Sequence, residues 1–175
     1  DRDGVINQDS STYIKSAEEW IPISGSIDAI ARLHQANFRV IIASNQSGIA
    51  RGYFDEAALT RMHDKMNSLV EDSGGVISAI FYCPHSPDEG CSCRKPKTGL
   101  LERAEVEFDI SLAGDYFVGD SLKDLQAANS FNMEPILVRT GNGRQTEIAL
   151  SKEMRDQTRI FNDLKSAVSW ILNKQ

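Results

Sequence analysis

Short apolar runs alternate with amphipathic segments along most of this chain. The run 38–43 (FRVIIA) is rich in β-branched residues and almost continuously apolar, which is typical of a strand buried on both faces of a parallel sheet. The runs 76–82 and 135–138 have the same character, and 116–118 is a shorter candidate. The hydrophobic pattern therefore predicts at least four buried strands.

Helical periodicity fills the intervals between these strands. Four segments place apolar residues on one helix face, and three of them follow a residue that favours the N-cap position. The stretch 140–159 is polar and weakly patterned, and we expect a surface loop with some helix there. The predicted helical segments are 27–33, 59–69 behind Asp55, 101–108 behind Thr98, and 164–172 behind Asp163.

Alternation of strands and helices predicts an α/β fold. We expect a three-layer, doubly wound, Rossmann-like parallel sheet with helices on both faces, forming one domain over residues 1–175 without a large cap domain. Ligands of such sheets bind beyond the carboxyl ends of the strands. Ser44, Cys83 and the pair Gly119-Asp120 each follow a predicted strand, so chemistry is expected at that edge.

Composition narrows the classes of partner. Hydrophobic residues make up 41% of the chain and charged residues 25%, as in ordinary soluble domains, and no apolar run is long enough for a membrane helix. The net charge is −6, which argues against nucleic-acid or anionic-membrane binding because both need a basic surface. A bound phosphate group must therefore be held by local cations.

All three cysteines lie in one short segment. Cys83-Pro84-His85 is followed by Cys91-Ser92-Cys93, which supplies three thiolates and one imidazole, enough for a closed tetrahedral zinc site. With no open coordination position, the zinc would brace the loop structurally. Thiols crowded in this way indicate a reducing compartment, so we expect a cytoplasmic protein. His34 and His63 have no such neighbours and are expected to be ordinary surface or packing residues.

Carboxylates and cations with catalytic spacing lie at the predicted strand ends. Asp1 and Asp3 stand two apart on an Asp-x-Asp-Gly turn, a pattern that also occurs in plain turns and calcium loops. Asp120 is placed to share a Mg²⁺ ion with Asp1, although a Gly-Asp turn also caps helices. Lys95 supplies a compact positive charge, and the Ser44 hydroxyl, with the main-chain N–H groups of Asn45 and Gln46, offers a cradle for phosphate oxygens.

Asp1 and Asp3, Ser44, Lys95 and Asp120 stand in the order of the four signature motifs of the haloacid-dehalogenase superfamily, which this chain resembles over its whole length. The resemblance implies that Asp1 attacks phosphorus, that Asp3 transfers protons, and that Lys95 and Ser44 stabilise the phosphoryl group. It also implies Mg²⁺ bound by Asp1, Asp3 and Asp120. A turn of this kind needs a strand before it, so we expect a short apolar strand ahead of Asp1.

Within the superfamily, the zinc loop is similar to that of the histidinol-phosphatase-like group. The segment 44–52 (SNQSGIARG) resembles the branch acting on heptose bisphosphates, which implies a phosphatase on the route to nucleotide-activated heptose and contacts from Ser44, Asn45, Gln46 and Ser47 to a small sugar bisphosphate. A second phosphate needs a second cation beside Lys95, and the candidates are Arg51 and Arg94.

Three alternatives stay open at this point. Histidinol phosphate is the nearest alternative substrate. A zinc-braced binding module without catalysis would show degraded motifs, and a zinc-stabilised nucleic-acid binder would need more basic residues than Arg94, Lys95 and Lys97. No exposed apolar helix is evident as a partner surface, so a monomer is expected.

Overall fold

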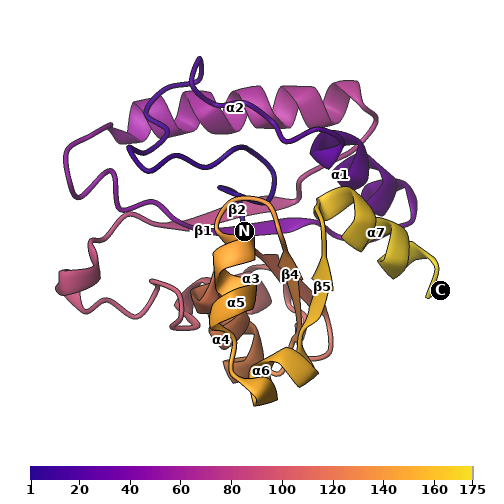
Figure 1. Ribbon diagram of the computed structural model, residues 1–175. Helices are drawn as coiled ribbons and strands as arrows, with labels where there is room; N and C mark the ends of the chain where they lie inside the picture. The colour runs from indigo at the N-terminus through magenta and orange to yellow at the C-terminus, as the bar shows by residue number, and fades with distance from the viewer. Residues whose placement is uncertain (175) are drawn as a thin grey trace.

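Parallel strands lie between two groups of helices (Figure 1). The computed structural model describes residues 1–174. The elements in chain order are α1 (Ser26–Gln35), β1 (Ile41–Asn45), α2 (Glu56–Asp72), β2 (Ala79–Cys83), the 3-10 helix η1 (Pro87–Glu89), α3 (Gly99–Phe108), β3 (Tyr116–Gly119), α4 (Leu122–Ser130), β4 (Glu134–Val138), α5 (Gly143–Ala149), α6 (Lys152–Gln157), β5 (Arg159–Phe161) and α7 (Leu164–Leu172).

Every strand pair in the described chain is parallel. β1 pairs with β2, with Ile41 opposite Ala79, and a second sheet has the order β3-β4-β5. The predicted runs 38–43 and 76–82 start before β1 and β2 do. The apolar residues ahead of each strand belong to the approach to the sheet, because the regular ladder starts only where Ile41 faces Ala79.

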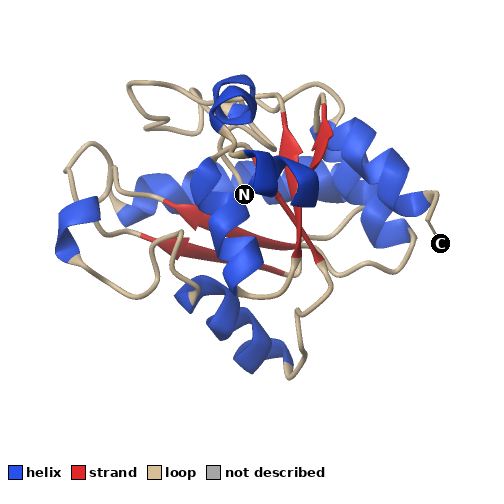
Figure 2. Ribbon diagram, turned by 60° about the horizontal axis from the view of Figure 1, so that its bottom comes forward, coloured by secondary structure: helices blue, strands red, loops and turns tan. Residues whose placement is uncertain are grey.

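Helices lie on both sides of the strands (Figure 2), and two separate apolar cores pack between strands and helices, which confirms the three-layer arrangement. Side chains from α1, α2 and α7 form the larger core, and side chains from α3 and α4 form the other. Burying a large apolar side chain contributes roughly 1.5–3 kcal/mol each, so these two cores supply the main favourable term in folding. Fully buried examples are Ile30, Leu59, Met62, Met66 and Val168 in the first core, and Leu100, Ala127 and Ala128 in the second.

An apolar cavity of about 380 Å³ separates β1 from β3. Its lining includes Ile41–Ala43 of β1 and Tyr116–Val118 of β3, and Asp1 also lines it. The main-chain nitrogen of Asp1 donates to the Val118 carbonyl oxygen at 2.7 Å, so the start of the chain is tied to β3. In residues 1–174 the single expected sheet is thus two sheets, and the strand expected ahead of Asp1 stays a prediction.

The polar stretch 140–159 contains the expected helix, as α5 and α6. Strand β5 was missed. Only three residues long and partly exposed, it is too short to show a period along the sequence. No helix within residues 1–174 combines the length and the apolar character needed to cross a membrane.

The helix caps give a stability prediction. Asp55 accepts a hydrogen bond from the Ala58 N–H at 2.7 Å, whereas Thr98 at the start of α3 makes no side-chain cap bond. Asp55→Ala should lower the free energy of unfolding by about 1 kcal/mol, and Thr98→Ala should lower it by less. Urea unfolding of both variants checks this, and equal losses would contradict the assignment of the caps.

Candidate active site

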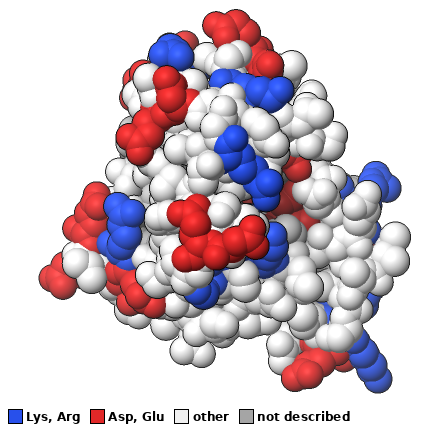
Figure 3. Space-filling model, turned by 90° about the vertical axis from the view of Figure 1, so that its left-hand side faces the viewer, with Lys and Arg blue, Asp and Glu red and all other residues white. Residues whose placement is uncertain are grey.

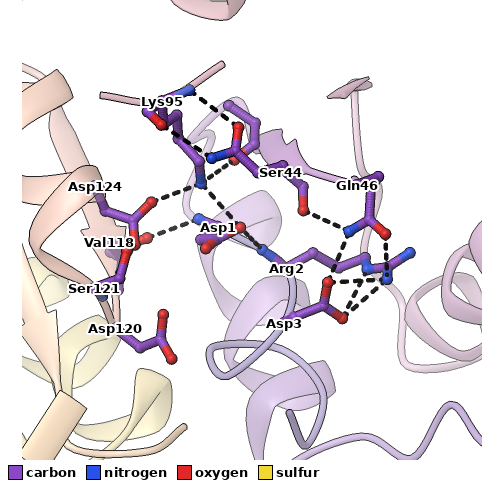
Figure 4. Close-up of polar contacts among 12 residues, drawn as sticks. Asp1, Arg2, Asp3, Ser44, Gln46, Lys95, Val118, Asp120, Ser121 and Asp124 are labelled. Carbon is purple, nitrogen blue, oxygen red and sulfur yellow. Dashed lines mark hydrogen bonds and ion pairs between the residues drawn. The ribbon is translucent and has the colours of Figure 1, made fainter. Parts of the chain in front are cut away.

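Residues at the ends of parallel strands lie at one edge of the structure, as predicted, and Figure 4 shows Ser44 and Asp120 near Asp1 and Lys95. Ser44 lies at the end of β1, Cys83 ends β2, and Asp120 follows β3 directly. Asp1 joins them through its bond to Val118 in β3. The parallel arrangement is what brings these residues together, because parallel strands present their carboxyl ends at the same edge.

Lys95 is the centre of this site. Its side chain is only 2% exposed, and its ammonium group contacts Asp1 Oδ1 at 3.0 Å, Asp124 Oδ1 at 2.6 Å and the Ala43 carbonyl oxygen at 2.8 Å. The Asn45 side chain fixes the main chain of Lys95 by donating to its carbonyl and accepting from its N–H. These bonds hold the Lys95 side chain in one conformation, with its positive charge next to the Asp1 carboxylate.

Two carboxylates, those of Asp1 and Asp124, contact this ammonium group, and a third, that of Asp120, lies close to both. Asp1, Asp120 and Asp124 each bring one oxygen within 4.8 Å of the others. Burial raises the pKa of Asp120 to about 6. Burial would also raise the pKa of Asp124, but the charge of Lys95, the main-chain amine of Asp1 and the hydrogen bonds from Lys95 and Ser121 together outweigh burial and hold that pKa below its usual range. Three ionised carboxylates against one Lys leave two negative charges in excess, so this cluster can hold a divalent cation.

The position of Asp120 is fixed by the loop after β4 and by helix α5, which follows it. The main-chain N–H of Asn142 donates to Asp120 Oδ2 at 2.7 Å, and the Thr146 hydroxyl donates to the Asp120 carbonyl at 2.8 Å. Gly4 and Gly141 pack against the same carboxylate. A Cβ atom on either residue would collide with Asp120 Oδ2. The protein therefore holds one carboxylate oxygen of Asp120 and leaves the other for a ligand.

Asp3 lies outside this cluster of three carboxylates. Its carboxylate accepts hydrogen bonds from the Arg2 guanidinium, from Asn7 Nδ2 at 2.8 Å and from Gln46 Nε2 at 2.7 Å. Burial raises the pKa of Asp3, but Arg2 and the two amide donors outweigh burial and hold that pKa below its usual range. In the described structure the third carboxylate of the cluster is that of Asp124, where the sequence had suggested Asp3.

The expected phosphate cradle is present only in part. Ser44 is 1% exposed, and its Oγ accepts from Gln46 Nε2 at 2.8 Å, which leaves the hydroxyl proton available to a ligand. The Asn45 and Gln46 side chains are already bonded within the protein, and the Gln46 N–H donates to the Cys83 carbonyl at 2.7 Å. Ser47 is largely buried, whereas Arg51 is exposed.

The four predicted zinc ligands form a second donor cluster at the end of β2. The Cys83 and Cys91 sulfurs lie 3.6 Å apart, as do those of Cys91 and Cys93. His85 Nδ1 lies 3.5 Å from the Cys83 sulfur and 3.3 Å from the Cys93 sulfur. Arg94 donates from Nη1 to the His85 carbonyl at 3.2 Å, so this loop is coupled to the residue next to Lys95.

Acidic and basic side chains are interspersed on the face in Figure 3, and acidic atoms lie inside a recess with basic side chains beside it. Sequence reasoning missed several polar residues at the site, among them Arg2, Asn7, His63 and Asn142. A cation between Asp1 and Asp3 was a usable signal for Arg2. For His63 and Asn142 there was no such signal, because α2 and the loop after β4 reach the site only through the fold.

Comparisons with known proteins point to one family. A family model described as HAD-hydrolase-like matches residues 92–167. A Pseudomonas aeruginosa protein named D-glycero-beta-D-manno-heptose-1,7-bisphosphate 7-phosphatase is 52% identical, with 98% of this chain and 95% of that protein covered. A Neisseria meningitidis protein of the same name is 45% identical over 99% of this chain and 93% of its own length.

A solved structure supports the same grouping. The D,D-heptose 1,7-bisphosphate phosphatase from B. bronchiseptica, crystallised with magnesium and phosphate, superposes with a TM-score of 0.94 at 49% identity, covering 99% of this chain and 96% of that one. Likeness of this extent covers every strand and helix described above. The chain therefore belongs to the D-glycero-beta-D-manno-heptose-1,7-bisphosphate 7-phosphatase family of HAD-like hydrolases.

Proposed function

We propose that this chain is a phosphatase that removes the 7-phosphate of D-glycero-β-D-manno-heptose 1,7-bisphosphate through an aspartyl-phosphate on Asp1. The observation that carries the proposal is the contact of the buried Lys95 ammonium group with the Asp1 carboxylate at 3.0 Å. A fixed cation beside a carboxylate suits attack on a phosphate ester, because it reduces repulsion between two anions. The choice of sugar rests on the names of the relatives.

We propose Mg²⁺ as the cation of the carboxylate cluster. The donors are all oxygens, two negative charges are in excess, and the B. bronchiseptica structure was obtained with magnesium. The carboxylates of Asp1 and Asp120 would bind the ion directly, and the carboxylate of Asp124 lies beside them. Asp3 would have to leave Arg2 for its carboxylate to join them, so we assign that carboxylate to proton transfer. When bound, the ion supplies charge stabilisation to the phosphoryl oxygens.

The roles of the protein groups follow from their contacts. As Asp1 forms its bond to phosphorus, the bond to the sugar oxygen breaks, and Asp3 gives a proton to that oxygen. Asp3 reacts in its protonated form, which is the minor form because its pKa is held below its usual range. Asp3 then takes a proton from the water that attacks phosphorus, and the bond to Asp1 breaks. Lys95 and the Ser44 hydroxyl face the transferred group, and Asp124 holds the second side of the Lys95 ammonium at 2.6 Å.

A sugar bisphosphate carries a second anionic group that does not react. We assign that group to Arg94, which is half-buried and fixed through one N–H to His85 at 3.2 Å, with donors left over for a phosphate. Arg51 is exposed and is the second candidate. Histidinol phosphate has only one phosphate and would need neither Arg94 nor Arg51. A requirement for either arginine therefore distinguishes the heptose bisphosphate from histidinol phosphate as the substrate. The buried position of Lys95 argues against a basic nucleic-acid-binding face.

We propose zinc for the cysteine and histidine cluster. Tetrahedral zinc bonds of ordinary length place two sulfurs about 3.8 Å apart and a sulfur and a nitrogen about 3.5 Å apart. The cluster distances of 3.6 Å, 3.5 Å and 3.3 Å are close to that geometry before any adjustment. The ion would stiffen the loop that carries Arg94 and Lys95 and would take no part in the reaction.

Compartment and assembly are part of the same proposal. Three free thiols in one cluster suit a reducing cytoplasm. We propose that the chain acts there as a monomer in one domain, with no nucleic-acid or membrane partner. Its product would feed the synthesis of nucleotide-activated heptose for lipopolysaccharide or a related glycoconjugate.

Asp1→Asn should abolish turnover, because the amide cannot form the acyl phosphate. With Mg²⁺ present, phosphate release should show a much larger kcat/KM for the heptose bisphosphate than for histidinol phosphate, and the variant should release neither. Preference for histidinol phosphate would make that compound the substrate and would leave the proposed roles of the residues unchanged. Release that survives in the variant would remove Asp1 as the nucleophile.

Gly4→Ala should weaken Mg²⁺ binding, because the new Cβ would displace the Asp120 carboxylate. Gly114→Ala is the matched control: Gly114 has φ of +85° against +77° for Gly4, and nothing lies within 4 Å of its Cβ position. Both variants bear a backbone cost of roughly 1–2 kcal/mol, but only Gly4→Ala should raise the Mg²⁺ concentration needed for half-maximal activity, by about tenfold or more. Equal Mg²⁺ dependence would contradict the assigned position of Asp120.

Removal of zinc with a chelator should lower the melting temperature. A loss of about 2–3 kcal/mol corresponds to a fall of roughly 5–10 °C in a chain of this length. Cys83→Ser, which deletes a ligand, should melt at the lower temperature from the start and should not respond to the chelator. A wild-type melting temperature that is the same with and without chelator would argue against a bound structural ion.

A further inference from the structure

Arg2 touches both carboxylates of the Asp-x-Asp turn. Its main-chain N–H donates to Asp1 Oδ1 at 2.7 Å. Its guanidinium donates to Asp3 from Nη2 at 2.9 Å and 3.0 Å and from Nε at 3.2 Å. Such a fork fixes the plane of the Asp3 carboxylate as well as its distance. One residue thus sets the separation between the nucleophile and the proposed proton-transfer group.

The guanidinium itself is held from two other parts of the chain. Nη2 donates to Gln46 Oε1 at 3.1 Å, and Nη1 lies 3.3 Å from His63 Nε2 on α2. Arginine has no acceptor, so His63 Nε2 must be the acceptor and the proton of that ring must lie on Nδ1. Burial, followed by the charge of Arg2, lowers the pKa of His63 to about 4. The imidazole is therefore neutral and complements the cation next to it.

Burial excludes a direct role for this cation in substrate binding. The Arg2 side chain is 1% exposed, and the atoms Nε, Nη1 and Nη2 all have protein partners. A buried guanidinium needs good hydrogen bonds to offset its desolvation, and it has them only while Asp3 stays in place. The contacts to Gln46 and His63 keep Arg2 in position if Asp3 shifts during the reaction.

We propose that Arg2, anchored by His63, is the positioning residue of Asp3, holding its carboxylate at the leaving oxygen of the substrate. This inference rests on the proposed function, in which Asp3 protonates the departing sugar oxygen. It assigns a role to His63, which the sequence had suggested to be an ordinary residue. Substrate and metal would be bound by other side chains, so Arg2 acts on proton transfer alone.

The test is the dependence of the rate on the leaving group. A p-nitrophenolate needs little protonation as it departs, whereas a sugar alkoxide needs a proton. Arg2→Met should lower kcat/KM for the heptose bisphosphate by about 10- to 100-fold and for p-nitrophenyl phosphate by less than about threefold. Inhibition by inorganic phosphate should stay within about twofold. Arg2→Lys keeps the charge without the fork and should fall between wild type and Arg2→Met.

His63 gives an independent variant that does not remove the buried cation. His63→Gln offers an amide oxygen to Arg2 and should stay near wild type, whereas His63→Leu offers no acceptor and should show a weaker form of the Arg2→Met pattern. Arg139→Met is the matched control, because it removes a similar fork, to Glu147, outside the cluster. In that control both substrates should be affected equally.

Two results would overturn the inference. Equal losses on both substrates in Arg2→Met and Arg2→Lys would mean that the pair with Asp3 is only structural. A weaker inhibition by phosphate would mean that Arg2 supports binding. Asp3→Asn separates these from failure of the proposed function. It should discriminate between the two substrates more strongly than Arg2→Met, and equal kcat/KM losses in that variant would remove Asp3 as the proton donor.

Discussion

The contacts of the Lys95 ammonium group are the constraint on which the rest of the site depends. A buried ammonium group is costly unless it is paired and fully hydrogen-bonded, and Lys95 has Asp1, Asp124 and the Ala43 carbonyl as partners. These partners belong to the start of the chain, to α4 and to β1. The ammonium group therefore connects both sheets at their carboxyl ends. The Asn45 side chain, which bonds to the main chain of Lys95, provides a second connection from Lys95 to β1.

Two carboxylates two residues apart have different surroundings, which fits different chemical roles. Asp1 has the ammonium of Lys95 and lies among two further carboxylates, an arrangement that favours a cation and an incoming phosphate group. Asp3 has the guanidinium of Arg2 and two amide donors, an arrangement that fixes its direction. Lysine and arginine are not interchangeable here, because a compact charge suits the first position and a planar fork suits the second.

The fold class, the helix on each interval and the residues at the strand ends were predictable because apolar periodicity and the edge rule for parallel sheets depend on sequence alone. The partners of Asp3 and Asp120 were not. His63 lies 61 residues from Arg2 in the chain, and Asn142 lies 22 residues from Asp120, so only folding makes them neighbours. The Gln46 N–H was expected to be free for phosphate, but the ladder beside β2 extends to it.

The most direct measurement of the central claim is chemical trapping of the phosphorylated residue. Enzyme quenched during turnover of the heptose bisphosphate and reduced with borohydride converts an aspartyl-phosphate into homoserine, which peptide mass spectrometry locates. The account predicts homoserine at position 1 alone, and none in enzyme quenched without substrate. Homoserine at position 3, 120 or 124, or a burst of phosphoenzyme that leaves Asp1 unmodified, would contradict it.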